Sequence, residues 1–342
     1  MGVDPSQLIE LGGSVAAVAA ADETGLLDSL AQSGSPEEHA ERLGLDPSAV
    51  ALVLDTLVAL GVAGRAGGRV AVSEPFAAAA GTPLAALLPM RRLWRHLPRF
   101  LMTGEPYAQM DGSPAERAAE YRDLAAALGG LFQPAAEELA AKLSPASGQI
   151  LDVGAGSGVW SLAMCVRSPA SRVTALDLPD VLPAFGDRAE QLGLADRIDT
   201  IPGDFHEAVL GGTFRRIVLA NVLHLERPEP AASLVHRAAA ALEPGGDLVV
   251  VDCFRDDDPA RQTAYAVYAL HLAMRTRTGR VHARAEVERW AREAGLSAGT
   301  GIRLHARPWN VAALVHRRAS RRTVTTRRRR CRLAWRPPSA TR

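Results

Sequence analysis

The chain has 342 residues and a formal net charge of +1, and 47% of its residues are hydrophobic. This length and apolar content allow about two domains with cores of their own, whereas the absence of an apolar run of about 18 residues argues against a membrane span. The sequence does not open on a basic segment followed by an apolar core, and its three cysteines lack metal-ligand spacing. We therefore expect a cytoplasmic protein with neither disulfides nor a metal site.

Residues 1–80 have the pattern of helices followed by a short hairpin. Ser35 and Pro36 precede two acids, which is a typical helix start. Segments 37–44 and 47–60 then form a helix–turn–helix pair, and a glycine turn at 67–68 joins two β-prone stretches. This order predicts a winged helix, a form that often binds DNA.

Charge opposes DNA binding by residues 1–80. They contain eleven acids and three arginines, whereas a DNA-binding face gains affinity by neutralising phosphates with cations. We therefore expect no nucleic-acid partner. Instead we predict a winged-helix dimerisation domain over 1–80, with the apolar surface of residues 8–30 as the homodimer interface.

Residues 81–145 are predicted to be mostly helical, with helices over 84–100, 114–128 and 133–143. The region holds Trp94, Tyr107 and Tyr121 in a chain that is otherwise poor in aromatic residues. Helix packing between domains accounts for them, and so does a lining for a flat, apolar substrate, since ligand pockets favour domain junctions. Both interpretations stay open for this linker region.

Strand and helix patterns alternate over residues 146–316, as in a parallel sheet covered by helices on both faces. The last two strands lie too close in sequence for a parallel crossover, so they should be antiparallel. The fold class is therefore α/β, with a Rossmann-like sheet whose last strand is antiparallel. The strand candidates are 150–153, 172–176, 197–201, 216–219, 247–251, 298–303 and 309–315.

Residues 317–342 contain eleven arginines and no acid, so the rest of the chain carries a net negative charge. This segment has little apolar periodicity, and we expect a basic, disordered tail. A nucleic-acid contact by the tail would rest on composition alone.

A short apolar strand, three glycines and a helix follow one another at the start of the α/β region. Asp152 precedes Gly154, Gly156 and Gly158, and Val159 stands where a dinucleotide-binding fingerprint would require glycine. Glycines suit this position because the backbone must turn sharply and a ligand must approach it closely. No lysine follows them, which counts against a bound triphosphate.

Two later motifs narrow the choice of ligand. Asp177 ends the second strand, where a carboxylate can accept hydrogen bonds from both ribose hydroxyls. Gly203, Asp204 and Phe205 follow the third strand, where a polar side chain and an aromatic ring can bracket an adenine. The combination suits a ligand that contains adenosine but no pyrophosphate, and we predict S-adenosylmethionine as the cofactor.

The sequence resembles the S-adenosylmethionine-dependent O-methyltransferases of the caffeic-acid and hydroxyindole type, including bacterial members that modify natural products. The resemblance covers most of residues 8–316 and implies a class I methyltransferase fold. It implies that the three glycines flank the cofactor, that Asp177 takes the ribose and that Asp204 with Phe205 holds the adenine, with Leu178, Gly203 and Asn221 beside them. The motifs that carry it are D-V-G-x-G-x-G at 152–158, D-L-P at 177–179, G-D-F at 203–205, N-V-L-H at 221–224, P-G-G at 244–246 and A-G-L at 294–296.

The resemblance also implies a general base. His224 follows the fourth strand, on the same rim of the sheet as the glycines, and the family's matching histidine removes the acceptor proton. Asp252, at the end of the fifth strand, is expected to orient it. A second acid of the family is missing, because Val281 occupies its place. His282 is a candidate for part of that role, although a surface position is the commoner case for such a histidine.

These features predict methyl transfer to a hydroxyl of a small aromatic or polyketide-like natural product. Methylation of a carbon or nitrogen stays open because of the missing acid. Two further alternatives are a winged-helix regulator that senses an adenosyl ligand and a protein that binds S-adenosylmethionine without methylating anything.

Overall fold

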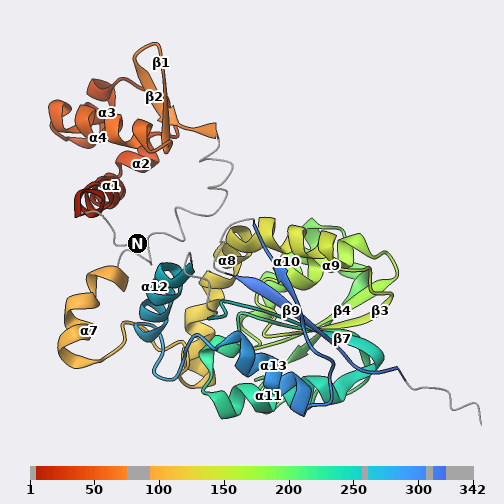
Figure 1. Ribbon diagram of the computed structural model, residues 1–342. Coiled ribbons are helices and arrows are strands. Elements are labelled where there is room, and N and C mark those ends of the chain that lie inside the picture. Colours follow the sequence, from red (N-terminus) through yellow and green to blue (C-terminus); the bar gives the residue numbers. More distant parts are fainter. Residues whose placement is uncertain (1–4, 75–92, 256–260, 306–310, 321–342) are drawn as a thin grey trace, which may run out of the picture.

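The structure, a computed structural model, describes residues 5–74, 93–255, 261–305 and 311–320. A helical N-terminal unit is followed along the chain by helix α7 (Leu97–Thr103) and then by a sheet covered with helices (Figure 1). Parts of the predicted helix over 84–100 and of the predicted strand over 309–315 lie outside the described residues, as do residues 321–342 of the tail predicted over 317–342. The predicted start of that tail is wrong, because Arg317 belongs to a strand of the sheet and the backbone N–H of Arg318 donates to the carbonyl of Gly246 at 2.9 Å. Within the described ranges, no helix is long and apolar enough to cross a membrane.

Four helices and one hairpin make up the N-terminal unit, which confirms the predicted winged-helix order. The hairpin strands pair antiparallel around the glycine turn. The elements are α1 (Pro5–Glu23), α2 (Leu26–Ser29), α3 (Pro36–Leu43), α4 (Pro47–Ala59), β1 (Ala63–Ala66) and β2 (Arg69–Val72).

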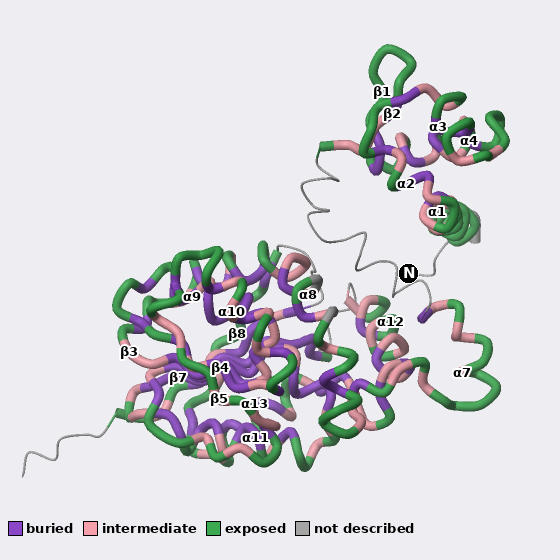
Figure 2. The backbone as a smooth tube through the Cα atoms, turned by 180° about the vertical axis from the view of Figure 1, so that it is seen from behind, coloured by how far each residue is buried: buried purple, intermediate pink, exposed green. Residues whose placement is uncertain are grey.

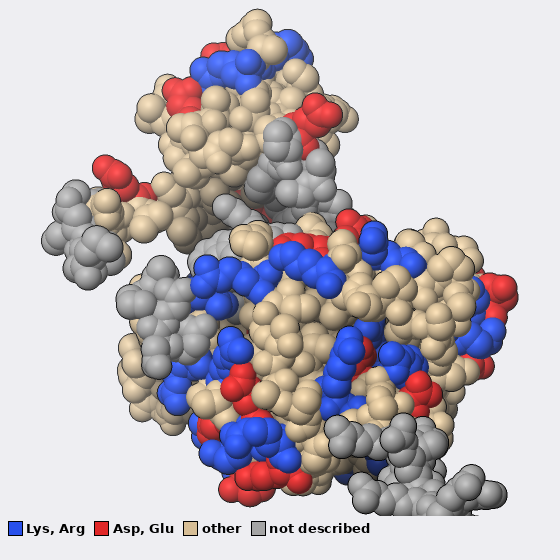
Figure 3. Space-filling view, turned by 45° about the vertical axis from the view of Figure 1, so that its right-hand side comes forward, with Lys and Arg blue, Asp and Glu red and all other residues tan. Residues whose placement is uncertain are grey.

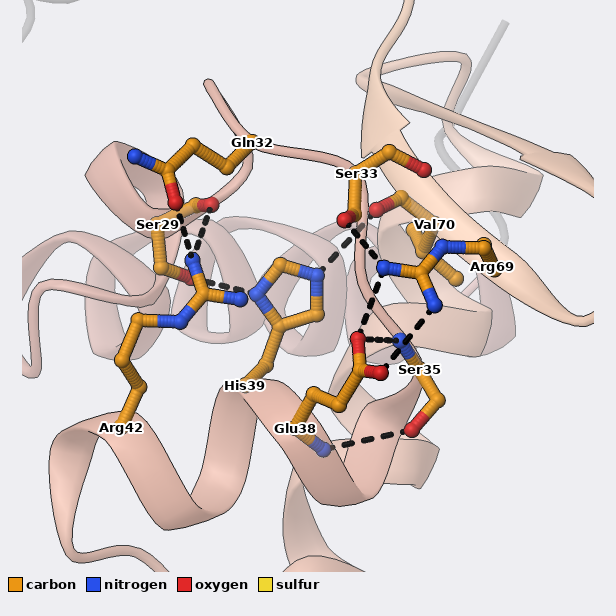
Figure 4. A network of polar contacts seen from close by, with 9 residues as sticks. All are labelled: Ser29, Gln32, Ser33, Ser35, Glu38, His39, Arg42, Arg69 and Val70. Atoms are coloured by element: carbon orange, nitrogen blue, oxygen red, sulfur yellow. Dashed lines mark hydrogen bonds and ion pairs between the residues drawn. The ribbon is translucent and has the colours of Figure 1, made fainter.

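A polar network around the buried His39 joins the hairpin of this unit to its helices (Figure 4). Ser35 caps α3, and its backbone N–H donates in return to the carboxylate of Glu38. His39 is fully buried, and its two ring nitrogens lie 2.8 Å from Ser29 Oγ and 3.1 Å from the carbonyl oxygen of Val70. A buried histidine with both nitrogens hydrogen-bonded stabilises the fold and is not free to bind a ligand.

The sheet of the second unit has seven strands in the order β5-β4-β3-β6-β7-β9-β8. Strands β3 to β7 are parallel, whereas β9 runs antiparallel to both β7 and β8, so the predicted antiparallel ending is confirmed. The strands are β3 (Gly148–Val153), β4 (Ser171–Asp177), β5 (Ile198–Pro202), β6 (Phe214–Ala220), β7 (Leu242–Asp252), β8 (Thr300–Arg303) and β9 (Ala312–Arg317).

Two apolar cores, one on each face, bury this sheet between helices (Figures 1 and 2). One face packs against α8 (Pro114–Lys142), α9 (Val159–Arg167) and α10 (Leu182–Gln191), and the other against α11 (Pro228–Ala241) and α13 (Arg284–Glu293). Helix α12 (Gln262–Ala273) follows β7, and the short 3-10 turns η1 (Ala195–Arg197) and η2 (Leu223–Leu225) follow α10 and β6. Burial on both faces explains why the central strands are almost continuously apolar.

The predicted break between helices over 114–128 and 133–143 is wrong, because α8 is continuous and contains Pro134. Local propensity favoured a break, since glycine and proline both weaken a helix interior. Packing outweighs it: Ala135 and Leu139 are fully buried against the sheet. Gly129 allows close contact with the glycine loop, because a Cβ there would lie 2.4 Å from Ser157 Oγ.

Candidate functional site

A cavity opens where the strand order of the sheet reverses. The chain passes from β3 outward to β4 and β5, and then returns to the other side of β3 with β6. In sheets of this kind, ligands bind at such a point beyond the carboxyl ends of the strands. The cavity is lined by residues from the ends of β3, β4 and β6 and by α8, which covers it: Arg117, Tyr121, Ala125, Leu128, Gly129, Phe132, Asp152, Gly154, Ala155, Gly156, Ser157, Val159, Trp160, Asp177, Leu178, Val181, Phe205, Ala220, Asn221, Val222 and Leu225.

The three predicted glycines form the loop between β3 and α9. Gly154, Gly156 and Gly158 have φ angles of 66°, 55° and 69°, in the left-handed region that side chains disfavour. A Cβ at Gly158 would also lie 2.4 Å from the ring of Phe185, and one at Gly154 would lie 2.5 Å from Val222. Gly156 faces more open space, since its nearest neighbour would be 4.0 Å away. The loop therefore needs glycine for both backbone and packing reasons.

Asp177 ends β4 and faces this loop. Its carboxylate accepts hydrogen bonds at 2.7 Å from the backbone N–H groups of Gly156 and Leu178. Burial nevertheless raises the pKa of Asp177 above its ordinary value. Asp177 and Leu178, two of the residues predicted to bind the cofactor, both line the cavity.

A second carboxylate, that of Asp152, also lines the cavity and was not among the predicted site residues. Asp152 is buried and accepts a hydrogen bond from Ser161 Oγ at 2.5 Å. Burial raises the pKa of Asp152 to about 7, and the nearby charge of Asp177 adds to that effect. Two carboxylates that are costly to ionise in one cavity favour a ligand with positive charge.

Asn221 follows β6 and has an uncommon backbone conformation. Its φ angle is 57°, and no other described residue except glycine has a positive φ. The backbone N–H of Asn221 donates to the carbonyl of Val251 at 2.8 Å, whereas its side-chain Oδ1 is buried without a partner. A strained residue with an unsatisfied buried oxygen is typical of a ligand-binding position.

The predicted adenine-binding motif has a more complex geometry. Phe205 contributes to the cavity wall, but the carboxylate of Asp204 forms an ion pair with Arg117 of α8. Burial alone would raise the pKa of Asp204, but hydrogen bonds from the backbone N–H of His206 and from Arg117 lower it overall. The Arg117 guanidinium also lies over the Phe205 ring, 5.9 Å from its centroid. Gly203 comes directly after β5, and its backbone N–H donates to the carbonyl of Asp177 at 2.9 Å.

His224 and Asp252 form a buried pair at the ends of β6 and β7. Nδ1 of His224 lies 2.6 Å from Asp252 Oδ1, and the backbone N–H of His224 donates to Oδ2 at 3.2 Å. The Nδ1 hydrogen bond to a carboxylate fixes the tautomer, so Nε2 carries the lone pair. The Tyr268 ring meets the imidazole edge-on, at 88° and 5.7 Å between centroids.

His282 is not a surface residue, which corrects the commoner expectation for it. The side chain is 2% exposed, and its Nε2 lies 2.9 Å from the carbonyl oxygen of Leu223. His282 therefore supports the backbone of η2, next to His224. Val281, which replaces the missing acid, packs in an apolar cluster with Cys253, Tyr265 and Tyr268.

A histidine–carboxylate pair beside the adenine-binding motif and the question of a metal site complete the description. His206 pairs with Glu226 at 3.1 Å, and the hydrogen bond to that carboxylate raises the pKa of His206. In the part of the chain that the structure describes, no group of three or more histidines, cysteines or acids could hold a metal ion.

Comparisons with known proteins show what the chain is similar to. Residues 113–297 match the model of the O-methyltransferase domain family. The chain is 29% identical over 155 residues to a 3-hydroxy-5-methyl-1-naphthoate 3-O-methyltransferase from Streptomyces sahachiroi, and this match covers 45% of each chain. It is 27% identical over 274 residues to the tetracenomycin 8-O-methyltransferase of Streptomyces glaucescens, which covers 76% of this chain and 80% of that one. The human N-acetylserotonin methyltransferase, solved in complex with S-adenosylmethionine, has the same fold, with a TM-score of 0.75 and 19% identity over 94% of this chain and all of that one.

Proposed function

Because the chain belongs to the O-methyltransferase family, we propose that it transfers a methyl group from S-adenosylmethionine to a hydroxyl of a small aromatic or polyketide-like natural product. The two Streptomyces relatives described above are named for aromatic and polyketide acceptors, which supports this acceptor class. His224 acts as the general base in this proposal, and Asp252 orients it.

The observation that carries the proposal is the His224–Asp252 pair on the same sheet rim as the glycine loop. A phenol with a pKa near ~10 is mostly protonated at neutral pH, whereas free histidine has a pKa near ~6.5 and accepts protons readily. The 2.6 Å contact with Asp252 holds Nε2 as the proton acceptor and stabilises the imidazolium that forms. Such a positioned base is worth about 10²–10⁴ in rate.

The cavity residues fit S-adenosylmethionine. When bound, this cofactor supplies a methyl group that is already activated by a sulfonium charge. Asp177 takes the ribose hydroxyls, Asp152 offers a carboxylate to the positive charges, and the unpartnered Oδ1 of Asn221 offers a further acceptor. The positive φ angles of the glycine loop let the backbone approach the ligand closely. Phe205 supplies an apolar surface for the adenine, and Arg117 keeps Asp204 beside it.

The direct test is incubation of the protein with methyl-labelled S-adenosylmethionine and a panel of phenols, naphthols and hydroxylated polyketides. We expect label on an acceptor oxygen, located by NMR. Label on a carbon or nitrogen would identify a different methyltransferase. Tight cofactor binding without transfer to any member of the panel would contradict the proposed enzyme.

The dimer predicted from the sequence remains part of the proposal. Leu8, Ile9, Leu11 and Val15 of α1 have exposed fractions between 58% and 76%, which is unusual for a contiguous set of large apolar side chains. We propose that residues 1–80 pair with a second copy through this surface and that 81–145 lines the acceptor side. We propose also that 146–316 binds the cofactor, in the cavity that α8 covers. Light scattering at the mass of a monomer, with activity intact, would contradict the dimer.

A further inference from the structure

Helix α12 directs one row of side chains toward the base. Tyr268, His271 and Arg275 are spaced by three and four residues, so they lie on one face of the helix and its carboxyl end, and each is partly buried. The Tyr268 ring meets the His224 ring, and the His271 ring meets the Tyr268 ring at 5.9 Å between centroids. The Trp94 ring also meets the His271 ring, at 6.2 Å between centroids. This aromatic row has the base at one end and the Arg275 cation near the other.

Arg275 differs from the neighbouring arginines in its charge balance. Its Nη1 lies 3.2 Å from His271 Nε2, and no ion pair with an acid involves it among the described residues. By contrast, Arg277 pairs with Glu105 at 2.6 Å and Arg280 pairs with Glu286 at 3.2 Å. On the face of the molecule shown in Figure 3, many basic side chains likewise lie next to acidic ones.

His271 does not balance the positive charge of Arg275. Burial and the positive charge of Arg275 lower the pKa of His271 to about 3, so the ring is neutral and accepts a hydrogen bond from the guanidinium. The charge of Arg275 also acts on Tyr121, which lines the cofactor cavity, and on Tyr268, which contacts the base. Contacts through His271 and Tyr268 therefore connect Arg275 to the base, and its charge acts on the cofactor cavity at Tyr121.

We propose that Arg275 binds an anionic substituent of the acceptor, so that the substrates of this enzyme are aromatic hydroxy acids. The aromatic row of Tyr268 and His271 then receives the flat ring system, the hydroxyl meets His224, and the carboxylate pairs with the guanidinium. A planar guanidinium suits this role because it binds a carboxylate through two parallel hydrogen bonds. The inference rests on the proposed O-methyltransferase function and adds to it the charge of the acceptor.

The test compares a hydroxynaphthoate with its neutral methyl ester in the full-length protein. We expect kcat/KM for the acid to exceed that for the ester by about ten- to a hundredfold, as for one charge-assisted hydrogen-bonded pair. Arg275→Gln should remove this preference, mainly by raising KM for the acid, because glutamine still donates to His271 but carries no charge. Arg275→Lys should retain part of it.

Arg277→Gln is the matched control, since it removes an arginine two residues away whose charge is already paired with Glu105. It should leave the preference for the acid unchanged. Equal turnover of acid and ester by the unaltered protein, or an unchanged preference in Arg275→Gln with normal cofactor binding, would overturn the inference while leaving the O-methyltransferase function intact. Failure to methylate any hydroxyl would instead remove the proposed function.

Discussion

Replacement of Asp252 by asparagine tests how the base is held. In the structure, Asp252 Oδ1 accepts from His224 Nδ1 at 2.6 Å and from the Cys253 N–H at 2.8 Å, while Oδ2 accepts from the His224 N–H at 3.2 Å. The asparagine amide has only one oxygen. Its NH₂ group must therefore face either the His224 Nδ1–H and the Cys253 N–H or the backbone N–H of His224. The imidazole then loses the charge that stabilises its protonated form and adopts the other tautomer in part of the molecules.

The expected loss in kcat/KM for Asp252→Asn is about 10²–10⁴, which corresponds to roughly 3–5 kcal/mol of transition-state stabilisation. The unfavourable donor contact should also cost about 1–3 kcal/mol of folding stability. Initial rates of labelled methyl transfer, measured well below the melting temperature, separate the two effects.

Asp247→Asn is the control for stability. Asp247 is a buried acid on the same strand, paired with Arg216 at 2.6 Å, and it lies away from the carboxyl end of β7. Its replacement should cost about 3–5 kcal/mol in stability, because a buried guanidinium loses its partner, yet should retain most of kcat in the folded protein. If Asp252→Asn kept its rate within twofold while His224→Ala lost its own, the orienting role of Asp252 would be refuted.

Two further predictions concern the cofactor cavity. Gly158→Ala should lower the melting temperature far more than Gly156→Ala, because both have positive φ angles but only at Gly158 does a Cβ meet Phe185, at 2.4 Å; calorimetry showing equal shifts would contradict this packing. The affinity for S-adenosylmethionine should rise about tenfold between pH 6 and pH 8, because Asp152, with a pKa near 7, is mostly protonated at the lower pH and a cation binds its ionised form. S-adenosylhomocysteine, which lacks the sulfonium, should show a smaller rise by titration calorimetry, and an equal rise would speak against a sulfonium near Asp152.

The sequence predicted the sheet and its glycine loop well because both depend on local patterns. Apolar strands that alternate with helices define a parallel sheet, and Gly154, Gly156 and Gly158 stand where left-handed backbone is required. Only eight residues, 304–311, separate β8 from β9, which forced their antiparallel pairing. These features need no knowledge of distant contacts.

The features that the sequence did not predict depend on contacts between segments far apart in the chain. Helix α8 continues through Pro134 because it packs on the sheet, and the helix propensities of its residues do not reveal that packing. Arg117 reaches Asp204, 87 residues away, so its part in the site could not be read from its alanine-rich surroundings. His282 is buried through its contact with Leu223, 59 residues away.

The most direct test of the central claim is the rate of methyl transfer by His224→Ala with acceptors of different acidity. If His224 removes the acceptor proton, the variant should lose about 10²–10⁴ in kcat/KM with an ordinary phenol. It should lose far less with an acidic nitrophenol, whose oxygen is already largely ionised at the assay pH. Equal losses with both acceptors, or full activity with both, would contradict the assignment of His224 as the general base.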